Sequence, residues 1–120
     1  MKRIDFEERA AIIEDGAGVP RAWAEGYARL SLTKHPLGFT EKQWRQTIND
    51  GGRFLDRWAV KADRLGWSPE DAFGGRHLNP KWDRFGLVGL INGGDVVMMI
   101  RDAAKIRLES GSSVIYPRRR

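Results

Sequence analysis

A row of basic side chains follows one side of the segment from residue 40 to residue 65. The row consists of Arg53, Arg57, Lys61 and Arg64, at steps of four, four and three residues. Residues at these steps are neighbours on an α-helix, and their guanidinium and ammonium groups can bind the phosphates of nucleic acid. Asp50, Asp56 and Asp63 flank the row, so a solvated face whose charges largely cancel is the alternative interpretation.

The excess of positive charge lies in the C-terminal part of the chain. The formal net charge is +5, and residues 75–120 hold nine basic and four acidic side chains, whereas residues 1–74 hold twelve of each. Such an excess attracts polyanions, although a basic tail also serves solubility. We predict phosphate contacts in this part of the chain, and base stacking on its one tryptophan. The predicted contact residues are Arg84, Lys105, Arg107, Arg118, Arg119 and Arg120, with Trp82 as the stacking residue.

No constellation of side chains predicts catalysis. His77 and Asp83 could form a dyad, yet no serine or threonine near them has the setting of an activated nucleophile. The chain has no cysteine, and neither His77 nor His35 has metal-ligand spacing to another residue. Gly74-Gly75 and Gly93-Gly94 do not lead from a strand into a helix, as a phosphate-binding loop would. We therefore predict a protein that is not an enzyme and that binds no cofactor or metal.

Length and composition predict a single domain spanning residues 1–120. The chain length is typical of one domain, and 41% hydrophobic residues is too many for a wholly disordered chain. The longest apolar runs, Leu87–Ile91 and Val96–Ile100, are too short to cross a bilayer, and the start lacks the apolar stretch of a secretory signal. The absence of cysteine is compatible with a reducing compartment. We expect a cytoplasmic protein that does not associate with membranes.

Two short N-terminal helices are predicted, one over residues 6–15 and one from Pro20 to the stretch before Pro36. Such a pair can begin a helix-turn-helix, whose second helix reads the major groove. That helix here offers only Arg21 and Arg29 as basic residues, so packing of both helices against a core is the favoured interpretation. A further helix of one or two turns is predicted between residues 68 and 73.

The segment from residue 40 to residue 65 predicts one long amphipathic helix. Thr40 and Gln43 form a capping box, and Phe39 and Trp44 occupy the positions of a hydrophobic staple. Apolar residues at positions 44, 48, 55, 58, 62 and 65 form a stripe that keeps its phase across Gly51-Gly52. We therefore predict an unbroken helix in which the first glycine permits close approach of a neighbouring element.

Residues 75–85 lack periodicity and predict a loop, whereas residues 86–117 predict an antiparallel meander. Asn92-Gly93 and Ser110-Gly111-Ser112 are predicted to reverse the chain between strands. The first two predicted strands are apolar on both faces, which indicates a central position in the sheet, and the third alternates basic with apolar residues, which indicates one wet face. The four predicted strands are Leu87–Ile91, Val96–Ile100, Lys105–Glu109 and Val114–Tyr116.

Together these elements predict an α+β fold. Two short N-terminal helices and one long amphipathic helix pack on a C-terminal four-stranded antiparallel meander. The expected organisation is a helical part over residues 1–74, a loop over 75–85, the meander over 86–117 and a basic tail over 118–120. Four tryptophans are expected in the core. They are Trp23, Trp44, Trp58 and Trp67.

Most of the chain resembles small, functionally unassigned proteins of proteobacterial genomes and their mobile elements. The resemblance rests on RAAIIEDGAGVPRAWAEGYARL, GRFLDRWAVKADRLGWSPEDAFG and DRFGLVGLINGGDVVMMIRDAAKIRLESGSSVIYPR. The resemblance implies no catalytic residue and no ligand. The setting that it implies is DNA of mobile or phage origin, and hence an accessory role near replication, integration or host defence.

Two functions follow as hypotheses. The first is a non-catalytic, nucleic-acid-associated accessory module that binds phosphates through its basic C-terminal half, with the helical row as an extension. The alternative is a protein-protein interaction module, either a homodimer or an inhibitor of a host enzyme, that uses an apolar face or edge of the sheet. The alternative gains support from the apolar character of Val96–Ile100, because three helices need not cover both faces of a sheet.

Overall fold

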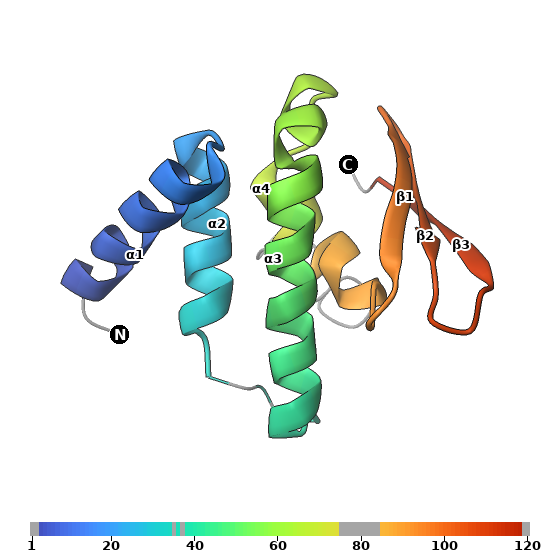
Figure 1. Cartoon of the computed structure of the whole chain (residues 1–120), viewed down its shortest axis with the longest axis horizontal. Coiled ribbons are helices and arrows are strands. Elements are labelled where there is room, and N and C mark those ends of the chain that lie inside the picture. Colours follow the sequence, from blue (N-terminus) through green and yellow to red (C-terminus); the bar gives the residue numbers. More distant parts are fainter. Residues whose placement is uncertain (1–2, 35, 37, 75–84, 119–120) are drawn as a thin grey trace.

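The computed structural model describes residues 3–34, 36, 38–74 and 85–118, and within the first helix it describes side chains from Phe6 onward. The fold is α+β, with several helices packed on a three-stranded antiparallel sheet. In Figure 1 the helices α1, α2 and α3 follow one another across the molecule, and the sheet lies beyond α3. The long helix α3 is therefore covered on two sides.

The helices match the predicted order with different lengths. The first two helices hold 15 and 12 residues, so the prediction of a helix limited to residues 6–15 was too short. The short helix that Ser68 caps is present. The elements in chain order are α1 (Arg3–Ala17), α2 (Arg21–Leu32), α3 (Glu41–Arg64), α4 (Pro69–Phe73), the 3-10 helix η1 (Gly86–Leu90), β1 (Asp95–Ile100), β2 (Ala103–Arg107) and β3 (Ser113–Pro117).

The long helix α3 runs unbroken through its glycine pair, as predicted. Both hydrogen bonds of the capping box form between Thr40 and Gln43 at its start. Gly51 is buried, and a Cβ atom there would lie 3.1 Å from atoms of both Tyr27 and Leu30 on α2. The Tyr27 hydroxyl donates a hydrogen bond to the Ile48 carbonyl, and burial raises the pKa of this phenol, which keeps the donor protonated. The missing side chain thus lets α2 and α3 approach closely.

Aromatic side chains fill the core between the helices, as their positions in the sequence predict. Trp23, Trp44 and Trp67 are buried, and Trp58 is partly buried. Each buried indole N–H donates to a distant acceptor, which removes the cost of an unsatisfied polar group. The acceptors are Asp63 Oδ1 at 3.1 Å, the Thr33 carbonyl at 3.0 Å and the Ile100 carbonyl at 2.9 Å, respectively.

The prediction of a first strand over Leu87–Ile91 was wrong. Most of this stretch forms η1, whose side chains at Leu87 and Val88 are buried. A short apolar run fits a buried strand and a buried helical turn equally well, so its period alone cannot distinguish them. Gly86 adopts a φ of 58°, which brings the start of η1 against the backbone of α4. Contact with α4 therefore decides the conformation.

The sheet accordingly has three strands rather than four, in the order β1-β2-β3. Strand β1 is an edge strand, which corrects its predicted central position. Its apolar residues do not alternate regularly because the register shifts between Val96 and Met98, leaving Val97 as an extra, exposed residue. Asn92-Gly93 does form a turn with positive φ at both residues, but the turn joins η1 to β1 rather than two strands.

Candidate interaction surface

The helical row of cations is divided by the fold. The carboxylate of Asp50 is 1% exposed and accepts hydrogen bonds from Arg53 at 2.8 Å, from Gln46 at 3.0 Å and from the Gly93 amide at 3.1 Å. Arg53 also donates to the Gly94 carbonyl at 2.8 Å. Arg53 and Asp50 thus join α3 to the turn before β1, and Arg53 is committed to internal contacts.

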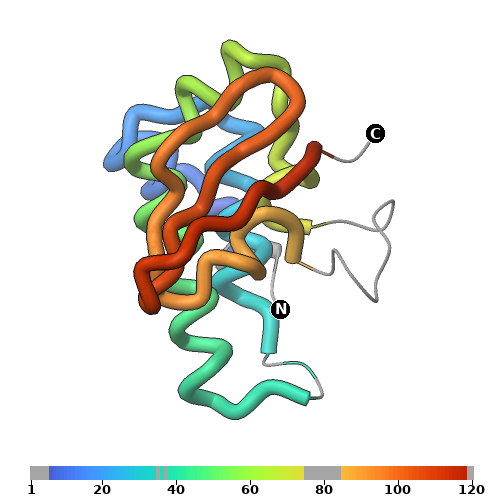
Figure 2. The backbone as a smooth tube through the Cα atoms, turned by 90° about the vertical axis from the view of Figure 1, so that its right-hand side faces the viewer, coloured from blue at the N-terminus to red at the C-terminus, as the bar shows by residue number. Residues whose placement is uncertain are grey.

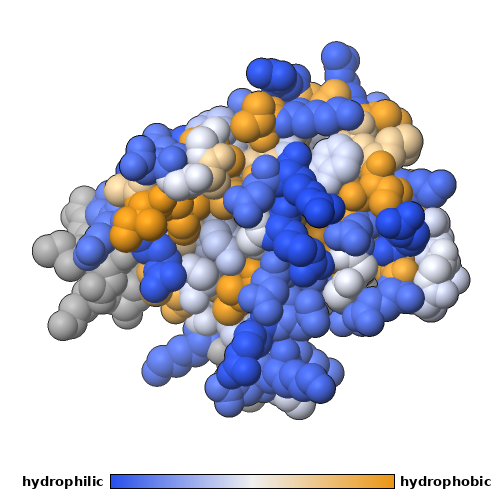
Figure 3. Space-filling view, viewed as in Figure 1, coloured by the Kyte–Doolittle hydropathy of each residue, from blue (hydrophilic) through white to orange (hydrophobic). Residues whose placement is uncertain are grey.

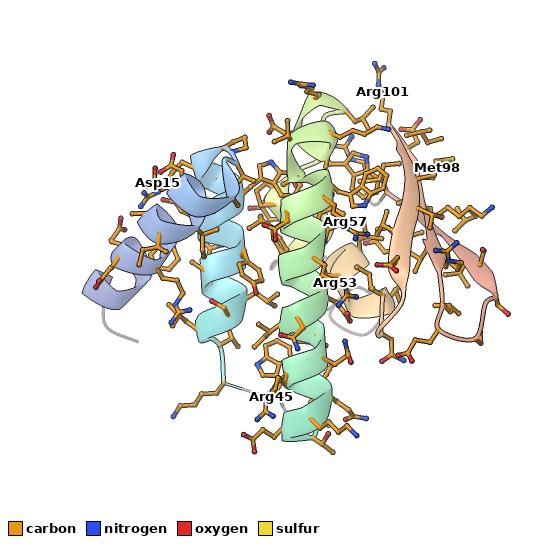
Figure 4. The ribbon with its side chains drawn as sticks, viewed as in Figure 1. Asp15, Arg45, Arg53, Arg57, Met98 and Arg101 are labelled. Carbon is orange, nitrogen blue, oxygen red and sulfur yellow. The ribbon has the colours of Figure 1, made fainter. Side chains whose placement is uncertain are left out.

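The other cations of the row are more exposed than Arg53. Arg57 lies 3.9 Å from the carboxylate of Asp95 on β1, and the Lys61 ammonium lies 5.4 Å from the centre of the Trp58 ring. Arg53 and Arg57 lie between α3 and β1 in Figure 4, and Figure 3 shows a band of hydrophilic side chains along α3. Aspartates therefore compensate the two arginines nearest the sheet, which weakens this row as a continuous phosphate-binding surface.

Arg118 forms contacts within the fold as well, and its side chain is largely buried. Its guanidinium group contacts the Asp71 carboxylate at 3.1 Å, donates to the Gly66 carbonyl and lies over the Trp67 ring. Only 18% of the side chain is exposed. Arg118 therefore anchors the end of β3 to α4 and to the segment between α3 and α4. Of the other predicted contacts, Arg84, Trp82, Arg119 and Arg120 lie outside the described residues.

The two faces of the sheet differ in their surroundings. In Figure 1 the helices lie on one side of the sheet, and Figure 2 looks at the sheet from the other side. Met99, Ala104 and Tyr116 are cross-strand partners on the covered face, and each is at most 2% exposed. Side chains of alternate residues point to opposite faces of a strand. The adjoining rows therefore lie on the face away from the helices.

We call this uncovered surface the outer sheet face. One of its cross-strand rows runs from Met98 on β1 through Lys105 on β2 to Ile115 on β3, and the next row contains Ile100 and Pro117. Ile115 is 58% exposed, Ile100 50% and Met98 40%. Large apolar side chains grouped in this way mark interaction surfaces more often than isolated ones do. The outer sheet face consists of Met98, Ile100, Lys105, Arg107, Ile115 and Pro117, and Asp95 is the cross-strand neighbour of Arg107 at its margin.

The predicted wet face of the strand bearing Lys105 and Arg107 is confirmed. Both side chains are exposed on β2, whereas Ile106 between them is buried. The sequence analysis did not group them with Met98 and Ile115, because that grouping depends on the register of three strands. The local signals for this surface were the alternation of residues 105–109 and the apolar character of Val96–Ile100. The strand itself begins and ends two residues earlier than predicted, at Ala103 and Arg107.

Comparisons with known proteins do not narrow the choice of family or function. No protein-family model matches the chain, and comparisons with curated proteins and with solved structures find no match. The resemblance to proteins of mobile elements therefore stays a prediction. Within residues 3–34, 36, 38–74 and 85–118, no helix combines the length and apolar character needed to cross a membrane. The same part of the chain holds no cluster of three acidic, histidine or cysteine side chains suited to a metal ion.

Proposed function

We propose that this protein is a non-catalytic interaction module that binds another protein through the outer sheet face. The supporting observation is the exposure of Met98, Ile100 and Ile115 on the side of the sheet that carries no helix. Each square ångström of apolar surface removed from water contributes about 25 cal/mol. Methionine also adapts its shape to different partners, which suits it to a binding surface.

Substitution of the exposed apolar residues tests this proposal. Peptides selected from a random display library against the wild-type protein are expected to lose roughly tenfold or more in affinity for a Met98→Ser/Ile115→Ser variant. The reason is that each substitution removes an exposed apolar side chain beside Lys105 on this face. Fluorescence anisotropy with the synthesised peptides measures the loss.

A matched variant controls for general changes in surface polarity. Ile12 on α1 and Val60 on α3 are 65% and 40% exposed, so Ile12→Ser/Val60→Ser removes similar apolar area elsewhere. This variant is expected to keep the wild-type affinity. A selection that yields no binders, or binders equally sensitive to both variants, would contradict the assignment of the outer sheet face.

Nucleic-acid binding is the second candidate, supported by one group of cations. Arg101 lies at the turn from β1 to β2, at the end of the molecule where α3 ends with Lys61 and Arg64 (Figure 4). The hydrogen bond from the Trp67 indole to the Ile100 carbonyl joins these two regions. In the described part of the chain, none of these cations forms an ion pair. Phosphates would therefore meet three cations without an ion-pair partner among the described residues.

Salt dependence tests this second candidate. If these cations bind phosphates, the affinity for a fluorescent duplex or single strand falls by about tenfold or more between 50 and 200 mM salt, because counterions are released on binding. The triple variant Lys61→Ala/Arg64→Ala/Arg101→Ala should flatten that dependence. Lack of binding at low salt in a fluorescence titration would exclude this function.

A further inference from the structure

The outer sheet face combines apolar and positive side chains in one patch. Lys105 lies on the central strand between Met98 and Ile115, and Arg107 follows it two residues later. Both cations are exposed. We infer, on the basis of the proposed function, that the partner is a protein segment in which apolar side chains alternate with aspartate or glutamate.

Charge complementarity is the main support for this inference. Strands β1, β2 and β3 contain one carboxylate, Asp95, which is the cross-strand partner of Arg107. Its oxygen lies 3.7 Å from Arg53 and 3.9 Å from Arg57 on α3, so these arginines compensate its charge. Lys105 and Arg107 form no ion pair with any described residue. A purely apolar partner would desolvate both cations without compensation, whereas carboxylates would pair with them.

A second copy of this chain fits the face poorly. Association about a two-fold axis brings the same surface patch of each copy together. The central position of Lys105 would then place its ammonium group near that of the other copy, with Arg107 adding to the repulsion. We therefore infer that the carboxylates belong to a different protein.

A nucleic acid is also a less suitable occupant. Proteins that bind single strands without base readout stack the bases on exposed aromatic rings. The one aromatic residue of the three strands, Tyr116, is 1% exposed and lies on the covered face. Exposed aliphatic side chains such as Ile115 instead suit the apolar side chains of a protein segment.

Charge reversal tests the inference. Display selection from a random peptide library is carried out on the wild-type protein and on Lys105→Glu/Arg107→Glu. We expect the wild type to enrich apolar peptides rich in aspartate and glutamate, and the variant to enrich apolar peptides rich in lysine and arginine. The acidic peptides should bind the variant roughly tenfold more weakly, because two attractions become repulsions.

Lys34→Glu/Lys42→Glu is the matched control, since it makes the same change in net charge at two exposed positions, one before α3 and one in its first turn. It should preserve the affinity for acidic peptides within about twofold. Peptides that depend on Met98 and Ile115 without an acidic bias would overturn this inference and leave the proposed function intact. Peptides that depend on neither would overturn both. If a fluorescent oligonucleotide binds the wild type but not the Lys105→Glu/Arg107→Glu variant, the ligand of the outer sheet face is a nucleic acid rather than a protein.

Discussion

Substitution of Arg53 with methionine is expected to lower the free energy of unfolding by about 3 kcal/mol. The buried carboxylate of Asp50 would lose its cationic partner and keep only the Gln46 amide and the Gly93 amide as donors. The Gly94 carbonyl would lose its bond to the guanidinium group as well. Urea denaturation followed by tryptophan fluorescence measures the change.

Arg57→Met is the matched control, one turn further along the same helix. Arg57 is 67% exposed and lies 3.9 Å from Asp95, so its loss should change stability by less than about 0.5 kcal/mol. Combining Arg53→Met with Asp50→Asn should destabilise less than the sum of the single changes, because the second change removes the buried charge that the first leaves without its cation. Equal effects of Arg53→Met and Arg57→Met would contradict the internal role of Arg53.

Gly86→Ala is expected to destabilise the fold by about 3 kcal/mol or more, with a fall in Tm of about 10 °C. A Cβ atom at this position would lie 2.5 Å from the Asp71 carbonyl oxygen and 2.9 Å from the Ala72 carbonyl carbon. Both contacts are to backbone atoms, so no change of rotamer can relieve them. The φ of 58° adds strain for any residue with a side chain.

Gly89→Ala serves as the control because it lies in the same 3-10 helix. Gly89 is exposed, and a Cβ atom there would lie 3.2 Å from the Phe85 Cβ atom. This substitution should change stability by less than about 1 kcal/mol. Thermal unfolding followed by circular dichroism compares the two variants. A Gly86→Ala protein as stable as Gly89→Ala would contradict the close packing of η1 on α4.

Arg53 and Arg118 are less available for phosphate binding than the sequence predicts. Both were predicted contacts, and both form bonds to residues far away in the chain, with separations of 41 residues from Gly94 and 47 residues from Asp71. Lys105 and Arg107 remain exposed, next to apolar side chains rather than in a wholly basic patch. This environment favours a protein partner over a polyanion.

The long helix was predictable because its determinants are local. The capping box joins residues three apart, and the apolar stripe depends only on helical periodicity. The Phe39 and Trp44 rings of the predicted staple lie 5.6 Å apart. Even the role of Gly51 followed from its place on the stripe, because only a missing side chain lets another helix approach so closely.

The strand predictions failed where local pattern is ambiguous. Leu87–Ile91 is apolar enough for either conformation, and its contact with α4 selects the 3-10 helix. The extra residue Val97 in β1 conceals the alternation that would have identified one exposed face. In contrast, the regular alternation of β2 predicted its wet face correctly.

The sequence by itself determined the α+β class, the caps and buried stripe of α3, and the side of β2 that faces water, because each depends on neighbours within a turn or a strand. Only the tertiary structure decided which cations are available and which apolar residues meet on the outer sheet face. Arg53 forms an ion pair with Asp50, and strand register brings Met98 and Ile115 beside Lys105. Such pairings join distant parts of the chain, and their free energy arises only when packing brings those parts together.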